Sequence, residues 1–124
     1  MSQSILVVDD NPSNLKLFTY LLALPGYAVT TAASAEQALD VLSHLVPDLI
    51  IMDLQLPDVD GLTLTRQLKA DPKMKGVPIV AVTASAMKGD EEKARAAGVD
   101  GYMSKPVEKR AFRAMVASYL DRGV

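Results

Sequence analysis

The chain contains no cysteine, which excludes disulfide bonds and thiolate metal sites and is compatible with a reducing compartment. No apolar run approaches the roughly 18 residues that a membrane span needs. The first residues also lack the basic segment and the apolar stretch of a signal peptide. The sequence therefore predicts a soluble, cytoplasmic protein without a membrane-inserted segment.

Basic residues are not in excess either. The 13 basic and 15 acidic side chains give a formal net charge of -2, without the basic stripe of a nucleic-acid-binding surface. We therefore expect no direct binding to nucleic acid. Apolar residues make up 49% of the 124 residues and charged residues 23%, which indicates one packed domain rather than a disordered chain.

Five short apolar runs predict five strands. They cover residues 5–8, 27–31, 49–52, 79–82 and, more weakly, 99–103. Three of these runs are aliphatic throughout, as strands covered on both faces are, whereas the run 27–31 alternates like an edge strand. We therefore predict a mostly parallel sheet.

Helix signals lie between and after these runs. Asn11 and Pro12 are the cap and first residue of a helix that stops at Pro25 and Gly26, and residues 34–37 form a capping box. Three further helices are expected from about residue 62 to 70, from about 87 to a stop at Gly98, and from about 107 to 120.

This alternation predicts an α/β fold, a doubly wound five-stranded parallel sheet flanked by five helices in one domain over residues 1–124. In the flavodoxin-like strand order 2-1-3-4-5, ligands bind beyond the carboxyl ends of the strands, between strands one and three. The polar residues that follow the strands should gather at that edge. They are Asp9, Asp10, Asp53, Thr83, Ser104 and Lys105.

Three clustered carboxylates predict a cation site. Two carboxylates about 4 Å apart repel by roughly 4 kcal/mol at an effective dielectric near 20. Oxygen ligands without cysteine or a nearby histidine select Mg²⁺ or Mn²⁺. An ammonium group and a hydroxyl beside such a metal indicate a phosphoryl group that bridges all three. Asp53, at the end of the central strand, is the predicted nucleophile.

These residues resemble a known family. In order and spacing they are similar to the receiver domain of two-component response regulators, in the CheY-like superfamily, with the set Asp9, Asp10, Asp53, Thr83, Ala84, Tyr102, Lys105 and Pro106. The resemblance covers the whole chain. The segments VVDDN, MDLQLPDVDG and VTASAMKGDEEKARAAGVDGYMSKP are most similar to stand-alone receivers of the DivK type.

The resemblance implies a phosphorelay function. Asp53 would accept a phosphoryl group from a phosphohistidine of a histidine kinase or histidine phosphotransferase. Asp10, Asp53 and the main-chain carbonyl of Gln55 would hold Mg²⁺, with Asp9 assisting through water. Gln55 and Ser85 stand where the family tunes the lifetime of the phosphoryl group.

The resemblance also implies how the signal is passed on. The Thr83 hydroxyl and the Ala84 amide would bind phosphoryl oxygens, and Lys105, joined to Pro106 by a cis peptide, would pair with them. Thr83 and Tyr102 would act as a switch that remodels the face of the fourth helix, fifth strand and fifth helix, where a downstream protein would bind. A tyrosine at this position can also be simple packing, and both interpretations stay open.

Other functions fit the sequence less well. Magnesium-dependent phosphatases with an aspartyl phosphate carry an Asp-x-Asp pattern after the first strand, whereas Asp9 and Asp10 are adjacent. A flavin site would need a loop rich in Gly, Ser or Thr, and nucleotide sites need GxGxxG or GxxxxGK[ST]; none is present. We expect stoichiometric phosphorylation and autodephosphorylation rather than enzymatic turnover. A receiver cut from a larger hybrid kinase or regulator stays an alternative.

Overall fold

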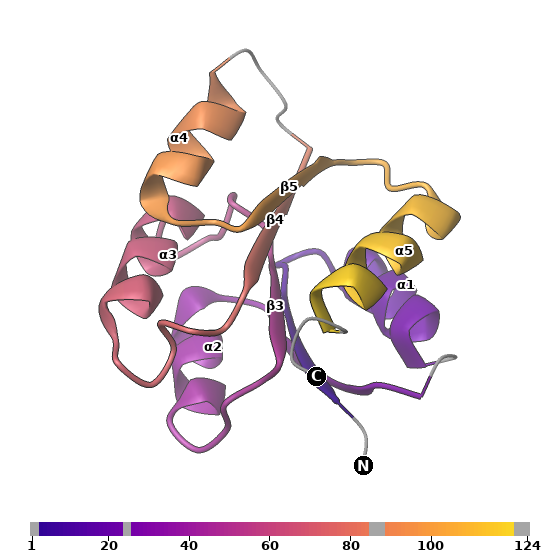
Figure 1. Ribbon diagram of the computed structural model, residues 1–124, viewed down its shortest axis with the longest axis horizontal. Helices are drawn as coiled ribbons and strands as arrows, with labels where there is room; N and C mark the ends of the chain where they lie inside the picture. The colour runs from indigo at the N-terminus through magenta and orange to yellow at the C-terminus, as the bar shows by residue number, and fades with distance from the viewer. Residues whose placement is uncertain (1–2, 24–25, 85–88, 121–124) are drawn as a thin grey trace.

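The computed structural model describes residues 3–23, 26–84 and 89–120. Its centre is a five-stranded parallel sheet in the order β2-β1-β3-β4-β5 (Figure 1). This confirms the predicted strand order and the edge position of the second strand. The strands are β1 Ser4–Val8, β2 Ala28–Ala32, β3 Leu49–Met52, β4 Ile79–Thr83 and β5 Gly101–Ser104.

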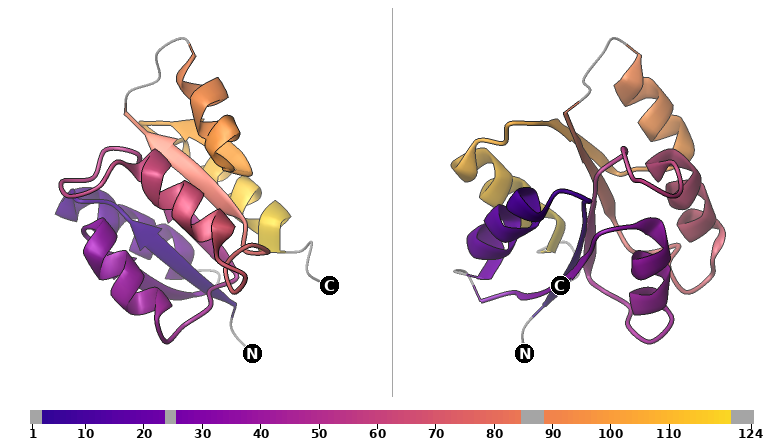
Figure 2. Two further views of the ribbon diagram at one scale, coloured as in Figure 1. Left: turned by 90° about the vertical axis from the view of Figure 1, so that its left-hand side faces the viewer. Right: turned by 180° about the vertical axis from the view of Figure 1, so that it is seen from behind.

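Five helices cover the two faces of the sheet. Helices α1 and α5 lie on one face, and α2, α3 and α4 lie on the other (Figures 1 and 2). In the described part of the chain, none of them has the length and apolar character that a bilayer-spanning helix requires. The helices are α1 Pro12–Ala23, α2 Ala35–Leu42, α3 Gly61–Ala70, α4 Asp90–Ala97 and α5 Lys109–Leu120.

The strands read as continuous aliphatic runs because both faces of the sheet are buried. In β1, Ile5 and Val7 pack into the core beneath α1 and α5, whereas Leu6 and Val8 pack into the core beneath α2, α3 and α4. This is the alternation expected of successive strand residues. The sheet is therefore held rigidly between two apolar cores, and the ends of its strands are fixed points for a site.

Two helices begin later than the sequence indicates. Helix α4 starts at Asp90, because Gly89 has a left-handed backbone (φ 92°) that a helix cannot include; Met87, where we placed its start, lies outside the described residues. Helix α5 starts at Lys109 rather than near Val107, and the Glu108 carboxylate accepts the Ala111 N–H at 2.7 Å. Strand β5 likewise runs two residues later at its start than predicted.

Candidate functional site

The three acids and the lysine predicted at one edge of the sheet lie close to one another. Asp9 follows β1 and Asp53 follows β3, and these strands are paired with Val8 opposite Met52. The Asp53 N–H donates to the Val8 carbonyl at 2.8 Å, which continues the ladder to the last residue before the site. The parallel ladder thus sets the spacing of the two acids.

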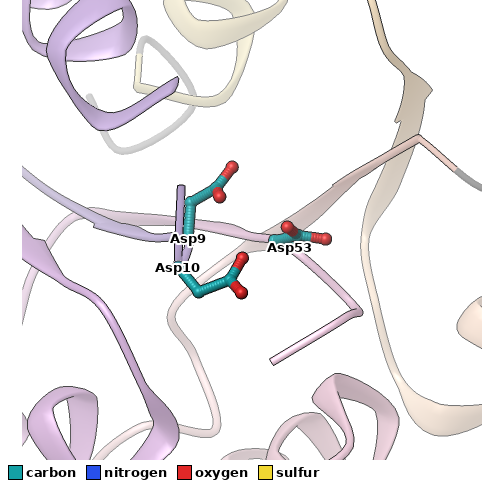
Figure 3. A group of neighbouring side chains, drawn as sticks. All are labelled: Asp9, Asp10 and Asp53. Atoms are coloured by element: carbon teal, nitrogen blue, oxygen red, sulfur yellow. The ribbon is translucent and has the colours of Figure 1, made fainter. Parts of the chain in front are cut away.

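Three carboxylates form the centre of this edge of the sheet, the rim that bears the site (Figure 3). One carboxylate oxygen from each of Asp9, Asp10 and Asp53 lies within 4.8 Å of the other two. Asp9 and Asp53 are only 1% and 6% exposed, whereas Asp10 is open to solvent. Two buried acids and one exposed acid therefore make a negatively charged site that is reachable from outside.

Lys105 brings one positive charge to the acids. Its Nζ donates to Asp9 Oδ2 at 2.7 Å and to Asp53 Oδ2 at 3.3 Å, and its side chain is 15% exposed. The loop that carries it is joined to β4, since the Lys105 N–H donates to the Thr83 carbonyl at 2.9 Å. One ammonium group cannot neutralise three carboxylates, so these four groups together carry net negative charge.

The two buried acids also shape the loops that follow them. Asp9 Oδ1 accepts the Asn11 N–H at 2.9 Å, and Asp53 Oδ1 accepts the Gln55 N–H at 3.0 Å. Both are local turns in which an aspartate binds the amide two residues later. In each residue one oxygen is used for the turn while the other contacts Lys105, so both carboxylates are held in a defined orientation.

A close backbone contact holds the loop after Asp53. The Gly61 N–H donates to the Leu54 carbonyl at 3.0 Å, and a Cβ added at Gly61 would lie 2.5 Å from Leu54 Cα and 2.8 Å from the Asp53 carbonyl oxygen. Only glycine fits there without a shift of the main chain. Gly61 is not among the predicted site residues, although an Asp-Gly pair at the start of a helix is a sequence signal for it.

Burial raises the pKa of the Asp53 carboxyl above its ordinary value, and the nearby Asp9 adds to the effect. The Gln55 amide and the Lys105 ammonium lower this pKa but do not cancel the rise. A raised pKa means that the ionised form is disfavoured in the folded, metal-free protein. A cation at the rim would remove that penalty.

This pKa shift predicts an effect on stability. The folded state holds the Asp53 proton more tightly than the unfolded state, so ionisation at pH 7 destabilises the fold, and the penalty fades as the pH falls through the raised pKa toward about 4. In EDTA at pH 7, Asp53→Asn should therefore melt at a higher temperature than the unchanged protein. The difference should shrink on acidification, as measured by calorimetry.

The matched control is Asp40→Asn, which removes an equal charge from an exposed position on α2. Its melting temperature should stay close to that of the unchanged protein at both pH values. Added Mg²⁺ should stabilise the unchanged protein more than Asp53→Asn. A lower melting temperature for Asp53→Asn in EDTA would contradict the prediction.

A family model described as the response regulator receiver domain matches residues 5–117. The chain belongs to this family. The polar-differentiation response regulator DivK of Brucella ovis is 45% identical over 120 residues, which cover 97% of this chain and 98% of that protein. DivK of Brucella anthropi is 44% identical with the same coverage.

Solved receiver structures share the fold. The CheY-like receiver from Methanospirillum hungatei superposes with a TM-score of 0.91 at 29% identity, over 98% of this chain and 96% of that one. The receiver domain of a sensor histidine kinase from Pseudomonas aeruginosa PAO1 has a TM-score of 0.89 at 35% identity, over 98% and 99% of the two chains. That structure carries a magnesium ion coordinated in its active-site cleft.

The other predicted site residues in the described part of this receiver domain follow the carboxyl ends of the strands. Thr83 is buried at the end of β4, and Ala84 follows it at an exposed position. The Lys105–Pro106 peptide is cis, as predicted. The side chain of Gln55 is exposed, and Ser85 lies outside the described residues.

Tyr102 lies on β5, the edge strand next to β4. It pairs with Ala81 across β4 and β5, and it is half-buried against the core cluster that contains Ala81 and Ala94. Burial raises the pKa of the Tyr102 hydroxyl, with a smaller contribution from the charges of Asp90 and Glu91 at the start of α4. The Tyr102 hydroxyl therefore lies near the acidic first turn of α4.

Proposed function

We propose that this receiver domain, acting as a single domain over residues 1–124, is a cytoplasmic phosphorelay component phosphorylated on Asp53. The phosphoryl donor would be the phosphohistidine of a histidine kinase or histidine phosphotransferase. The observation that carries the proposal is the position of Asp53, a buried carboxylate within reach of two further acids and 3.3 Å from the Lys105 ammonium. Charged groups of both signs are needed where a phosphoryl group is transferred.

The donor set fits magnesium. Three carboxylates with oxygens within 4.8 Å suit a hard dication such as Mg²⁺, or Mn²⁺ in its place. We assign Asp10, Asp53 and the main-chain carbonyl of Gln55 as ligands, with Asp9 acting through water. Bound Mg²⁺ would neutralise charge that develops on the phosphoryl oxygens. The magnesium ion in the active-site cleft of the related Pseudomonas receiver supports Mg²⁺ as the cation.

The side chains of the chain account for the rest of the transfer. An Asp53 carboxylate oxygen attacks phosphorus, the phosphorus–nitrogen bond of the donor breaks, and its electron pair leaves with the imidazole. Lys105 turns from the Asp53 carboxylate to the new phosphoryl oxygens, which it can hold by charge-assisted hydrogen bonds. The Thr83 hydroxyl and the Ala84 N–H are the proposed neutral donors to the same oxygens.

The test measures phosphoryl uptake by intact-mass spectrometry after incubation with Mg²⁺ and acetyl phosphate. We expect one phosphoryl group per chain, and none when EDTA is in excess. Stoichiometric uptake followed by slow loss fits a switch. Sustained release of phosphate from small phosphomonoesters, abolished at Asp10 rather than at Asp53, would instead indicate a magnesium-dependent phosphatase.

Thr83 and Tyr102 are the proposed switch pair, and the face formed by α4, β5 and α5 is the proposed site for a downstream protein. Changing the ratio of active to inactive conformers from 10:90 to 90:10 needs about 2.6 kcal/mol, which one or two charge-assisted hydrogen bonds can supply. Loading the protein with Mg²⁺ and beryllofluoride should shift amide resonances of β5 and of the first turn of α4. Shifts confined to the strand ends at the rim would contradict the switch.

A further inference from the structure

Asp58 ties the loop after the proposed nucleophile to a neighbouring helix. Its Oδ1 accepts the Ala35 N–H at 3.0 Å, and its Oδ2 accepts the Glu36 N–H at 2.9 Å. Ala35 and Glu36 are the first residues of α2, whose amides have no partner within the helix. One carboxylate thus joins two segments that lie more than twenty residues apart in the sequence.

The same loop carries the carbonyl that we assign to the metal. On the amino-terminal side, the Gln55 N–H donates to Asp53 Oδ1 at 3.0 Å, and the Asp53 N–H is hydrogen-bonded to the Val8 carbonyl of β1. On the other side, three residues later, Asp58 is held by α2. Leu54 and Leu56 pack against the core between these two anchors. A loop anchored on both sides keeps the Gln55 carbonyl in a narrow range of orientations.

We propose that Asp58 is a positioning residue for the magnesium site, and that it acts by clamping the 54–58 loop onto the start of α2. This inference rests on the proposed function, because it takes the Gln55 carbonyl as a ligand. Asp58 is not a ligand itself. Its contribution is to fix the loop before the metal binds, so that the loop loses less conformational entropy on binding.

The competing interpretation is that Asp58 only caps α2. The structure offers a control, because α2 has a second cap: the Ser34 hydroxyl accepts the Gln37 N–H at 3.1 Å. Ser34→Ala removes a helix cap without touching the 54–58 loop. Glu36→Gln removes a negative charge beside Asp58 while both amide hydrogen bonds remain, and it controls for the change in electrostatic potential.

The experiment is isothermal titration of Mg²⁺ into the full chain and its variants. We expect the Mg²⁺ dissociation constant of Asp58→Ala to rise about tenfold, as for groups that orient metal ligands in other proteins. Asp58→Asn keeps one oxygen acceptor and should show a smaller rise. Ser34→Ala and Glu36→Gln should bind Mg²⁺ like the unchanged protein, even where Ser34→Ala lowers the melting temperature.

Hydrogen exchange gives a second readout that a simple helix cap would not change. Coupling between two sites is reciprocal, so Mg²⁺ should slow amide exchange at Ala35 and Glu36 in the unchanged protein and in Glu36→Gln. A dissociation constant for Asp58→Ala equal to that of Ser34→Ala would overturn the inference while leaving the proposed function intact. Failure of the unchanged protein to bind Mg²⁺ would overturn both.

Discussion

Asp53→Asn should take up no phosphoryl group from acetyl phosphate under Mg²⁺ conditions in which the unchanged chain takes up one. The amide has nearly the shape of the carboxylate but lacks its negative charge and is a poor nucleophile. Lys105 also contacts Asp9 at 2.7 Å, a partner that this substitution leaves in place, so we expect the surroundings of the site to be preserved. Intact-mass spectrometry of both proteins measures the difference directly.

The other acids of the chain provide the controls. Asp10→Asn keeps the acceptor but removes a proposed metal ligand, so uptake should be slower and should need more Mg²⁺. Asp40→Asn removes an exposed acid of α2 and should leave the uptake unchanged. Uptake by Asp53→Asn at the rate of the unchanged chain would place the acceptor on another residue and would overturn the proposed function.

Gly61→Ala should destabilise the protein although alanine favours helices. At a helical position alanine is about 0.5–1 kcal/mol better than glycine. At Gly61, however, the added Cβ would lie 2.5 Å from Leu54 Cα and 2.8 Å from the Asp53 carbonyl oxygen, and main-chain atoms cannot rotate away. Such overpacking typically costs about 1–3 kcal/mol.

Calorimetry checks this prediction, since 1 kcal/mol corresponds to about 4 °C in melting temperature for a chain of this size. We also expect slower phosphoryl uptake, because the main chain of Asp53 must move. Gly76→Ala is the matched control: its Cβ would have no atom within 4 Å, and its backbone is not left-handed. A melting temperature of Gly61→Ala at or above that of the unchanged protein would show that Gly61 does not lie this close to the main chain of Leu54 and Asp53.

The sheet and the edge that carries the site follow from the residue pattern alone. The strands 5–8, 49–52 and 79–82 could be found from their aliphatic residues, because both sides of each strand are buried in the two cores. Since parallel strands end at one edge, the sequence predicts that the acids Asp9 and Asp53 meet there. Local patterns were enough for these conclusions.

The way in which the loops at that edge are held depends instead on contacts between distant segments. The roles of Gly61 and Asp58 depend on contacts with Leu54 and with the start of α2. The Asp-Gly pair at the start of α3 marks Gly61 but does not identify these partners. The start of α4 was misplaced because Gly89 bends the chain just before it. The periodicity of apolar residues indicates which face of a helix or strand is buried, whereas loop conformation follows from contacts between segments that folding brings together.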